Sequence, residues 1–255
     1  MTIRAMCPVA SSPMTGVDQG ASISVDDGAT FTPYYGIVNG QFYRVATDHD
    51  TPYHVCGPQQ DSGTVCVPSR TDFGEIRPGD WYAGGGFENG FLIADPLDHR
   101  YMYTQGWYHV LRRFDRTTSQ VVVLYQPKAD ERFGGAPPLA FSPDGHTLYM
   151  SAQHVLASTD RGETWRVISP DLLVKPGDAA IVTEPGAAAS VVGGAAPGGS
   201  IQSFAVSPVD PNVLWAGTSS GMIWVTKDAG KTWTHASDRQ SSDRVSAAHS
   251  RIRTP

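Results

Sequence analysis

The octapeptide Ser158-Thr-Asp-Arg-Gly-Glu-Thr-Trp165 occurs three times in this sequence, in slightly different forms. It returns as Thr226-Lys-Asp-Ala-Gly-Lys-Thr-Trp233 and, with Phe in place of Trp, as Ser24-Val-Asp-Asp-Gly-Ala-Thr-Phe31. Each copy begins with Ser or Thr, carries Asp, Gly and Thr at every second position after it, and ends on an aromatic residue. Each also follows a short apolar run that is typical of a β-strand. We therefore expect three copies of one local structure.

The residue types of this octapeptide predict a tight β-hairpin turn. The carboxylate of Asp160 can accept hydrogen bonds from amides of its own turn, and Gly162 can take the positive φ that such a turn requires. Thr164 adds a hydroxyl partner, and Trp165 begins the return strand with its ring against the hairpin. We interpret the Asp, Gly and aromatic positions of the three copies as structural: Asp26, Gly28, Phe31, Asp160, Gly162, Trp165, Asp228, Gly230 and Trp233.

Each octapeptide closes a longer repeat. Residues 139–151 read as a strand, a Ser-Pro turn and a second strand, and residues 204–217 have the same layout. A degenerate copy of the octapeptide lies at 114–118. A turn proline precedes the aspartate by 17 to 20 residues in four repeats: Pro8 and Asp26, Pro96 and Asp115, Pro143 and Asp160, Pro208 and Asp228. Such a near-constant offset indicates repeated supersecondary units.

Units of this size hold three or four short strands and cannot bury both of their faces alone, so they are expected to stack radially as blades of a β-propeller. We predict an all-β, incomplete propeller of about five blades, near residues 1–40, 41–80, 81–130, 136–170 and 200–236. Residues 171–199 are expected to form a long loop between blades, and residues 237–255 a polar, disordered tail. An array of stacked β-sandwiches is the alternative.

Composition and charge argue against several classes of protein. There are 19 Lys and Arg against 25 Asp and Glu, and no basic run precedes the last few residues, which disfavours nucleic-acid binding. No apolar run approaches the roughly 20 residues of a membrane helix, and no secretory signal is visible. Because Met1 leads directly into a segment like the middle of a repeat, we expect the chain to be a piece of a longer protein.

Three cysteines leave an odd count. Cys56 and Cys66 lie symmetrically about Asp61, so a hairpin centred there would bring them together across two strands. Two small buried thiols are an equally good interpretation, and Cys7 has no partner in either case.

The octapeptides resemble the Asp-box, or BNR, repeats of bacterial sialidases, xyloglucanase-type glycoside hydrolases and sortilin-like receptors. The chain is similar in particular to large bacterial BNR-repeat proteins described as glycosyl hydrolase-like or sortilin-like. Six segments carry this resemblance: residues 18–21, 41–48, 59–63, 68–70, 80–81 and 159–172. The resemblance covers residues 3–235 and implies propellers of about seven to ten blades in an extracellular or periplasmic protein. We expect the further blades and the export signal of such proteins to belong to the longer protein from which this chain comes.

Propellers place their functional groups on loops at the mouth of the central channel. The polar segment 59–63 is our strongest candidate, because it gathers polar groups without forming the octapeptide. A glycosidase needs two carboxyl groups about 5 to 10 Å apart, and we predict Asp61 and Glu88 as this pair. The alternative is that Asp61 caps a turn and Glu88 is solvated within residues 84–90. The predicted substrate-binding residues are Gln59, Gln60, Arg70, Trp81 and Trp107.

Asp48, His49, Asp50 and His54 are metal-ligand types in one loop, but this spacing is typical of a polar turn, and we predict neither a metal nor another cofactor. The sequence contains no nucleophile elbow, phosphate loop or zinc-protease helix, and the arginine cluster, tyrosine and glutamate of a sialidase cannot be placed.

Two functions remain open. One is glycan binding or glycoside hydrolysis at the channel mouth, and the other is a sortilin-like protein-binding scaffold without catalysis. The expected partner is accordingly a carbohydrate or a protein. The open flanks of an unclosed propeller also predict self-association.

Overall fold

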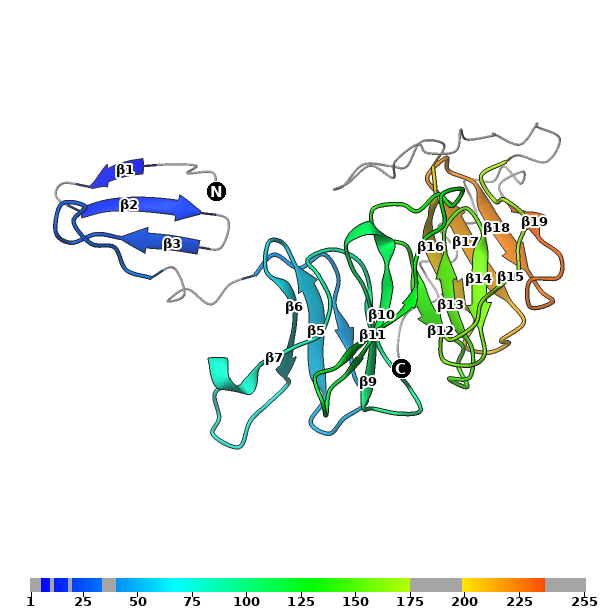
Figure 1. The fold of residues 1–255 in the computed structure, drawn as a ribbon, viewed down its shortest axis with the longest axis horizontal. Coiled ribbons are helices and arrows are strands. Elements are labelled where there is room, and N and C mark those ends of the chain that lie inside the picture. Colours follow the sequence, from blue (N-terminus) through cyan, green and yellow to red (C-terminus); the bar gives the residue numbers. More distant parts are fainter. Residues whose placement is uncertain (1–5, 10–11, 18–19, 34–39, 175–198, 237–255) are drawn as a thin grey trace, which may run out of the picture. The chain divides into compact units, whose positions relative to one another are not determined.

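The computed structural model describes residues 6–9, 12–17, 20–33, 40–174 and 199–236. Across these residues the strands form one three-stranded and four four-stranded antiparallel sheets, joined by loops and short 3₁₀ turns (Figure 1). The predicted all-β fold with about five blade-like sheets is confirmed. The predicted loop, apart from residues 171–174 and 199, and the predicted tail lie outside the described residues. The chain divides into two compact units, Met1–Gln126 and Pro127–Pro255.

The first unit contains three of the sheets. In each of them the strands follow one another in chain order as an antiparallel meander. The first sheet consists of β1 (Met6–Val9), β2 (Ser12–Val17) and β3 (Gly20–Ile23). The second consists of β4 (Ala46–Thr47), β5 (His54–Gln59), β6 (Gly63–Pro68) and β7 (Tyr82–Ala83), and the third of β8 (Leu92–Ala94), β9 (Tyr101–Gln105), β10 (Leu111–Asp115) and β11 (Val121–Tyr125). Strand β7 lies just beyond the blade limit of 80 that the sequence predicted.

The second and third sheets pack as neighbouring blades. Strand β4 lies against β8, so the first strands of the two sheets are adjacent, as in a propeller. Their shared core is apolar because strand residues alternate between the two faces. It contains Cys56, Cys66, Leu92, Ala94, Met102 and Phe114, with Tyr82 packed against it.

The Cys56 and Cys66 side chains are joined by a disulfide. The two residues are direct partners on β5 and β6, in a hairpin that turns at Asp61. The hairpin interpretation of these cysteines is therefore confirmed over the interpretation as free thiols.

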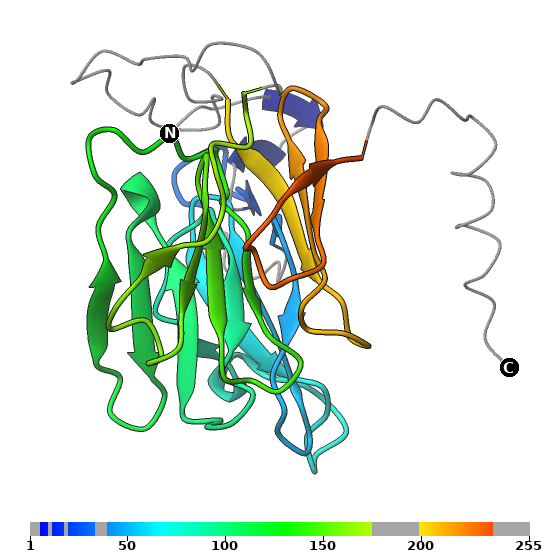
Figure 2. The same cartoon turned by 90° about the vertical axis from the view of Figure 1, so that its right-hand side faces the viewer.

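The second unit contains two four-stranded sheets. The first consists of β12 (Leu139–Phe141), β13 (Leu148–Ser151), β14 (Val155–Ser158) and β15 (Arg166–Val167). The second consists of β16 (Ile201–Val206), β17 (Leu214–Thr218), β18 (Ile223–Thr226) and β19 (Thr234–His235), drawn in yellow to orange-red in Figure 2. Strand β12 lies against β16, and the Trp233 indole N–H donates to the Ile168 carbonyl at 2.8 Å.

The three octapeptides adopt one geometry. The octapeptide at residues 158–165 shows this geometry. Asp160 accepts a hydrogen bond from the Thr164 amide at 2.9 Å and another from the Thr164 hydroxyl, and Gly162 has φ +91°. Gly28 and Gly230 have the same φ. In the degenerate copy, Asp115 instead accepts both the Thr117 amide and the Arg100 guanidinium.

The meander places loops alternately at the two ends of each sheet. In the second and third sheets, one end carries the β5–β6 turn, the β7–β8 connection and the β9–β10 loop, and we call it the turn end. The opposite end carries the β4–β5, β6–β7, β8–β9 and β10–β11 loops, and we call it the far end. Any candidate site in this unit can therefore be assigned to one end by its place in the meander.

Candidate functional site

The polar segment 59–63 forms the β5–β6 turn. Gln59 pairs with Gly63, and the Ser62 amide donates to the Gln59 carbonyl at 3.3 Å. Asp61 has φ +58°, a region that Asp tolerates better than most residues because its short polar side chain bonds locally. The Asp61 side chain is consequently displayed to solvent at the turn end.

The glycine-rich connection 84–90 brings Glu88 to this turn. The Glu88 Oε2 atom accepts the Asp61 amide proton at 2.6 Å. The Gly86 amide donates a hydrogen bond to Thr64 Oγ1 at 2.8 Å, which holds the connection in place. A methyl group at Gly86 would lie 1.9 Å from Thr104 Oγ1, so a larger residue there would clash. The structure thus brings together Asp61 and Glu88, which the sequence analysis predicted as a pair.

Tyr43 is a residue of the turn end that the sequence analysis missed. Its hydroxyl donates to Gln60 Oε1 at 2.7 Å, and 45% of the residue is exposed. Burial, with a further contribution from the negative charges of Glu88 and Asp61, raises the pKa of the Tyr43 phenol. Gln60 is therefore part of the cluster, and Tyr43 adds an aromatic face beside both carboxylates.

A second aromatic group of the turn end surrounds the β9–β10 loop. Phe87 is 40% exposed, and the Arg112 guanidinium lies 4.9 Å from its ring centroid, a cation–π distance. A methyl group at Gly106 would touch both of them. Tyr108 is 65% exposed and has φ +60°. Trp107 occupies the same loop, but its side chain lies outside what the structure describes.

Two predicted binding residues lie at the far end. Arg70 follows β6 and Trp81 precedes β7, whereas Asp61 precedes β6. A strand of six residues spans roughly 20 Å, so neither residue joins the cluster around Asp61. The Gln59 side chain lies against the segment before β4, because its Oε1 would lie 2.2 Å from a methyl group at Gly40.

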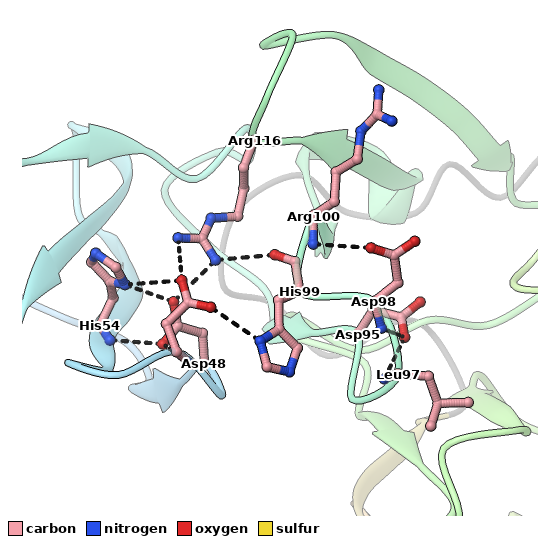
Figure 3. A network of polar contacts seen from close by, with 9 residues as sticks. Asp48, His54, Asp95, Leu97, Asp98, His99, Arg100 and Arg116 are labelled. Carbon is pink, nitrogen blue, oxygen red and sulfur yellow. Dashed lines mark hydrogen bonds and ion pairs between the residues drawn. The ribbon is translucent and has the colours of Figure 1, made fainter.

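The metal-ligand types Asp48, Asp50 and His54 gather at the far end, and Figure 3 shows Asp48 and His54 with Arg116 beside them. The Asp48 side chain is fully buried and accepts the His54 amide and Nδ1, each at 2.7 Å. Arg116, from the β10–β11 loop of the next sheet, contacts Asp48 Oδ2 at 3.1 Å and Asp50 Oδ2 at 2.8 Å. The Arg116 guanidinium therefore supplies a positive charge to both of these carboxylates.

Further contacts make this far-end cluster an ion-pair network between two sheets. His99 Nδ1 lies 3.1 Å from Asp50 Oδ1. Burial opposes ionisation of Asp50, but the hydrogen bond and positive charge of Arg116, together with the contributions of His99 and His54, outweigh burial and lower the pKa of Asp50. Burial raises the pKa of Tyr82 to about 12, although Arg116 lies over its ring. The charged groups of this cluster pair with one another and join the two sheets, which is a structural role.

Strand order and blade packing place this chain among the β-propeller proteins. No protein-family model matches the sequence, and no curated protein matches it. Solved structures do resemble it. The GH74 xyloglucanase of Xanthomonas campestris matches with 18% identity and a TM-score of 0.41, over 94% of this chain and 30% of the xyloglucanase.

Two structures from Bacteroides thetaiotaomicron are also similar over 91% of this chain. The extracellular domain of a putative one-component system has 12% identity, a TM-score of 0.49 and 27% of its own length covered. An auxiliary nutrient binding protein has 13% identity, a TM-score of 0.47 and 56% covered. This chain therefore spans about a quarter to just over half of these proteins. Since every one of these TM-scores is below 0.5, the propeller assignment rests on the strand order itself.

Proposed function

We propose that this chain binds carbohydrate at the turn end of its second and third sheets. The observation that carries this proposal is the cluster in which exposed aromatic rings stand beside carboxylate and amide groups. Sugars have apolar C–H faces and hydroxyl edges, so aromatic faces and hydrogen-bonding side chains together match them. The groups are Tyr43, Gln60, Asp61, Phe87, Glu88, Arg112 and Tyr108.

The resemblance to Asp-box, BNR-repeat proteins supports this proposal, because that class includes glycosyl hydrolase-like members. The Cys56–Cys66 disulfide supports the extracellular or periplasmic location that the same resemblance implies, since disulfides persist in oxidising compartments.

Glycoside hydrolysis is the second candidate function. It is favoured because the hydrogen bond from the Asp61 backbone amide to Glu88 brings two acidic residues to one turn, and glycosidases use two carboxyl groups. Release of reducing sugar by the wild-type chain, abolished in Asp61→Asn, is the result expected of an enzyme. Binding without release is the result expected of a lectin-like site.

The test is affinity electrophoresis through gels containing xyloglucan, mixed-linkage β-glucan or polygalacturonate. Tyr43→Ala should weaken retardation by one of these polymers at least about tenfold, because truncating a central aromatic residue removes a dominant contact. Phe73→Ala is the matched control. Phe73 is 75% exposed in the β6–β7 loop at the far end, with Arg77 5.4 Å from its ring.

Equal retardation of Tyr43→Ala and wild type, or selective loss in Phe73→Ala, would place the binding surface elsewhere and overturn the proposal. A folded wild-type chain that no glycan retards would favour the protein-binding scaffold instead.

A further inference from the structure

We propose that Glu88 is a positioning residue for the β5–β6 turn and that Asp61 is the carboxylate that contacts the ligand. This inference rests on the proposed carbohydrate site and separates the roles of its two acidic residues. It replaces the symmetrical pair of catalytic carboxylates that the sequence suggested.

The hydrogen bonding of the turn explains why Glu88 is needed. The Ser62 amide closes the turn by donating to the Gln59 carbonyl, and the Asp61 amide, one residue earlier, faces out of the turn. Glu88 Oε2 accepts that amide at 2.6 Å. A hydrogen bond to a carboxylate is shorter and stronger than one between neutral groups, so this contact fixes the turn firmly.

The turn is also held by the segment preceding β4, which contains Gln41 and Tyr43. The Gln60 amide donates to the Gln41 carbonyl at 2.9 Å, and the Tyr43 hydroxyl donates to Gln60 Oε1. Contacts from Tyr43 and from Glu88 thus both hold the turn, and we call these two contacts the clamp.

The two carboxylates differ in what remains free for a ligand. Glu88 is half-buried, and one of its carboxylate oxygens accepts a hydrogen bond from the Asp61 amide, whereas Asp61 is exposed to solvent. The positive φ of Asp61 sets the direction of this side chain, and the contacts from Tyr43 and Glu88 to the turn maintain that conformation. A preorganised group binds with less loss of conformational freedom than a mobile one.

The test compares Glu88→Ala with Glu88→Gln, which keeps an oxygen that can accept the amide but removes the charge. Binding of the retarding polysaccharide should weaken roughly ten- to hundredfold in Glu88→Ala and no more than about fivefold in Glu88→Gln. Asp61→Asn tolerates the same φ and should weaken binding at least about tenfold. Glu75→Ala, an exposed carboxylate of the far end, is the control.

A second readout does not depend on any glycan. The Asp61 amide proton resonance should lie downfield in wild type, remain nearly so in Glu88→Gln and move upfield in Glu88→Ala. Equal loss of binding in both Glu88 variants would mean that the charge of Glu88 acts on the ligand directly, and would overturn the inference. An Asp61 amide resonance that Glu88→Ala does not shift would also overturn it. If no glycan binds but the amide moves as expected, the proposed function fails while the clamp itself is upheld.

Discussion

At the scale of single residues, the aspartates of the repeated octapeptides are held ionised by their own turns. The Thr164 hydroxyl and amide, and then the Ser158 hydroxyl, lower the pKa of Asp160 from 3.8 to about 2. Thr232 has the same effect on Asp228. A hydrogen bond to the charged form favours ionisation, and these turns supply several such bonds to each carboxylate.

This lowering predicts acid lability of the octapeptide turns. A carboxylate with a depressed folded-state pKa contributes stability that is complete above the unfolded value of 3.8 and is lost as the pH falls toward about 2. The midpoint of thermal unfolding should therefore drop between pH 4 and pH 2.5. The double variant Thr164→Val and Thr232→Val should melt lower at pH 7 and show a shallower drop in acid.

Thr47→Val is the matched control, because Thr47 is an exposed strand residue outside the octapeptides. Parallel pH profiles for the double variant and the wild type would contradict the hydroxyl contribution.

The octapeptide turn could be predicted from sequence because every group it needs lies within eight residues. The hydroxyl, carboxylate and glycine of residues 158–165 satisfy one another locally, so composition and spacing determine the geometry. The same holds for Cys56 and Cys66, which a single turn at Asp61 brings together.

At the scale of elements, Arg116 joins the third sheet to the second through the buried carboxylate of Asp48 and the partly exposed carboxylate of Asp50. Arg116→Leu would leave Asp48, whose side chain is fully buried, without its arginine partner. Removing one member of a buried pair costs about 3 to 5 kcal/mol, and we expect a loss of this size in urea unfolding. Arg116→Lys should be intermediate, because an ammonium lacks the planar fork that reaches both carboxylates.

Arg70→Leu, at an exposed position of the β6–β7 loop, provides the control for a lost surface arginine. A change within about 0.5 kcal/mol for Arg116→Leu would contradict the role assigned to the far-end network.

Strand direction decides which parts of the site the sequence could predict. Asp61 and Arg70 are nine positions apart and were grouped together, yet β6 carries them to opposite ends of the sheet. Asp61 and Glu88 are farther apart in sequence, but the β7–β8 connection returns to the turn. Tyr43 was missed because its contact with Gln60 depends on how the segment before β4 pairs with β5.

At the scale of the whole molecule, the sequence repeats, folded as blade-like sheets, make up both compact units of the chain. Each unit contains neighbouring sheets whose first strands lie side by side, and such blades bury apolar faces that a lone unit would expose. No helix in the described part of the chain is long and apolar enough to cross a bilayer. Self-association through open propeller flanks stays a prediction.

The carbohydrate proposal assigns one end of the second and third sheets as the binding surface. The most direct measurement is a titration of the isotope-labelled chain with an oligosaccharide of the retarding polymer, followed by amide chemical shifts. If carbohydrate binds at the turn end, the largest shifts should fall on residues 60–62, 87–88 and 106–109. Shifts concentrated around Arg70 and Trp81 at the far end, or no shifts at saturating oligosaccharide, would contradict it.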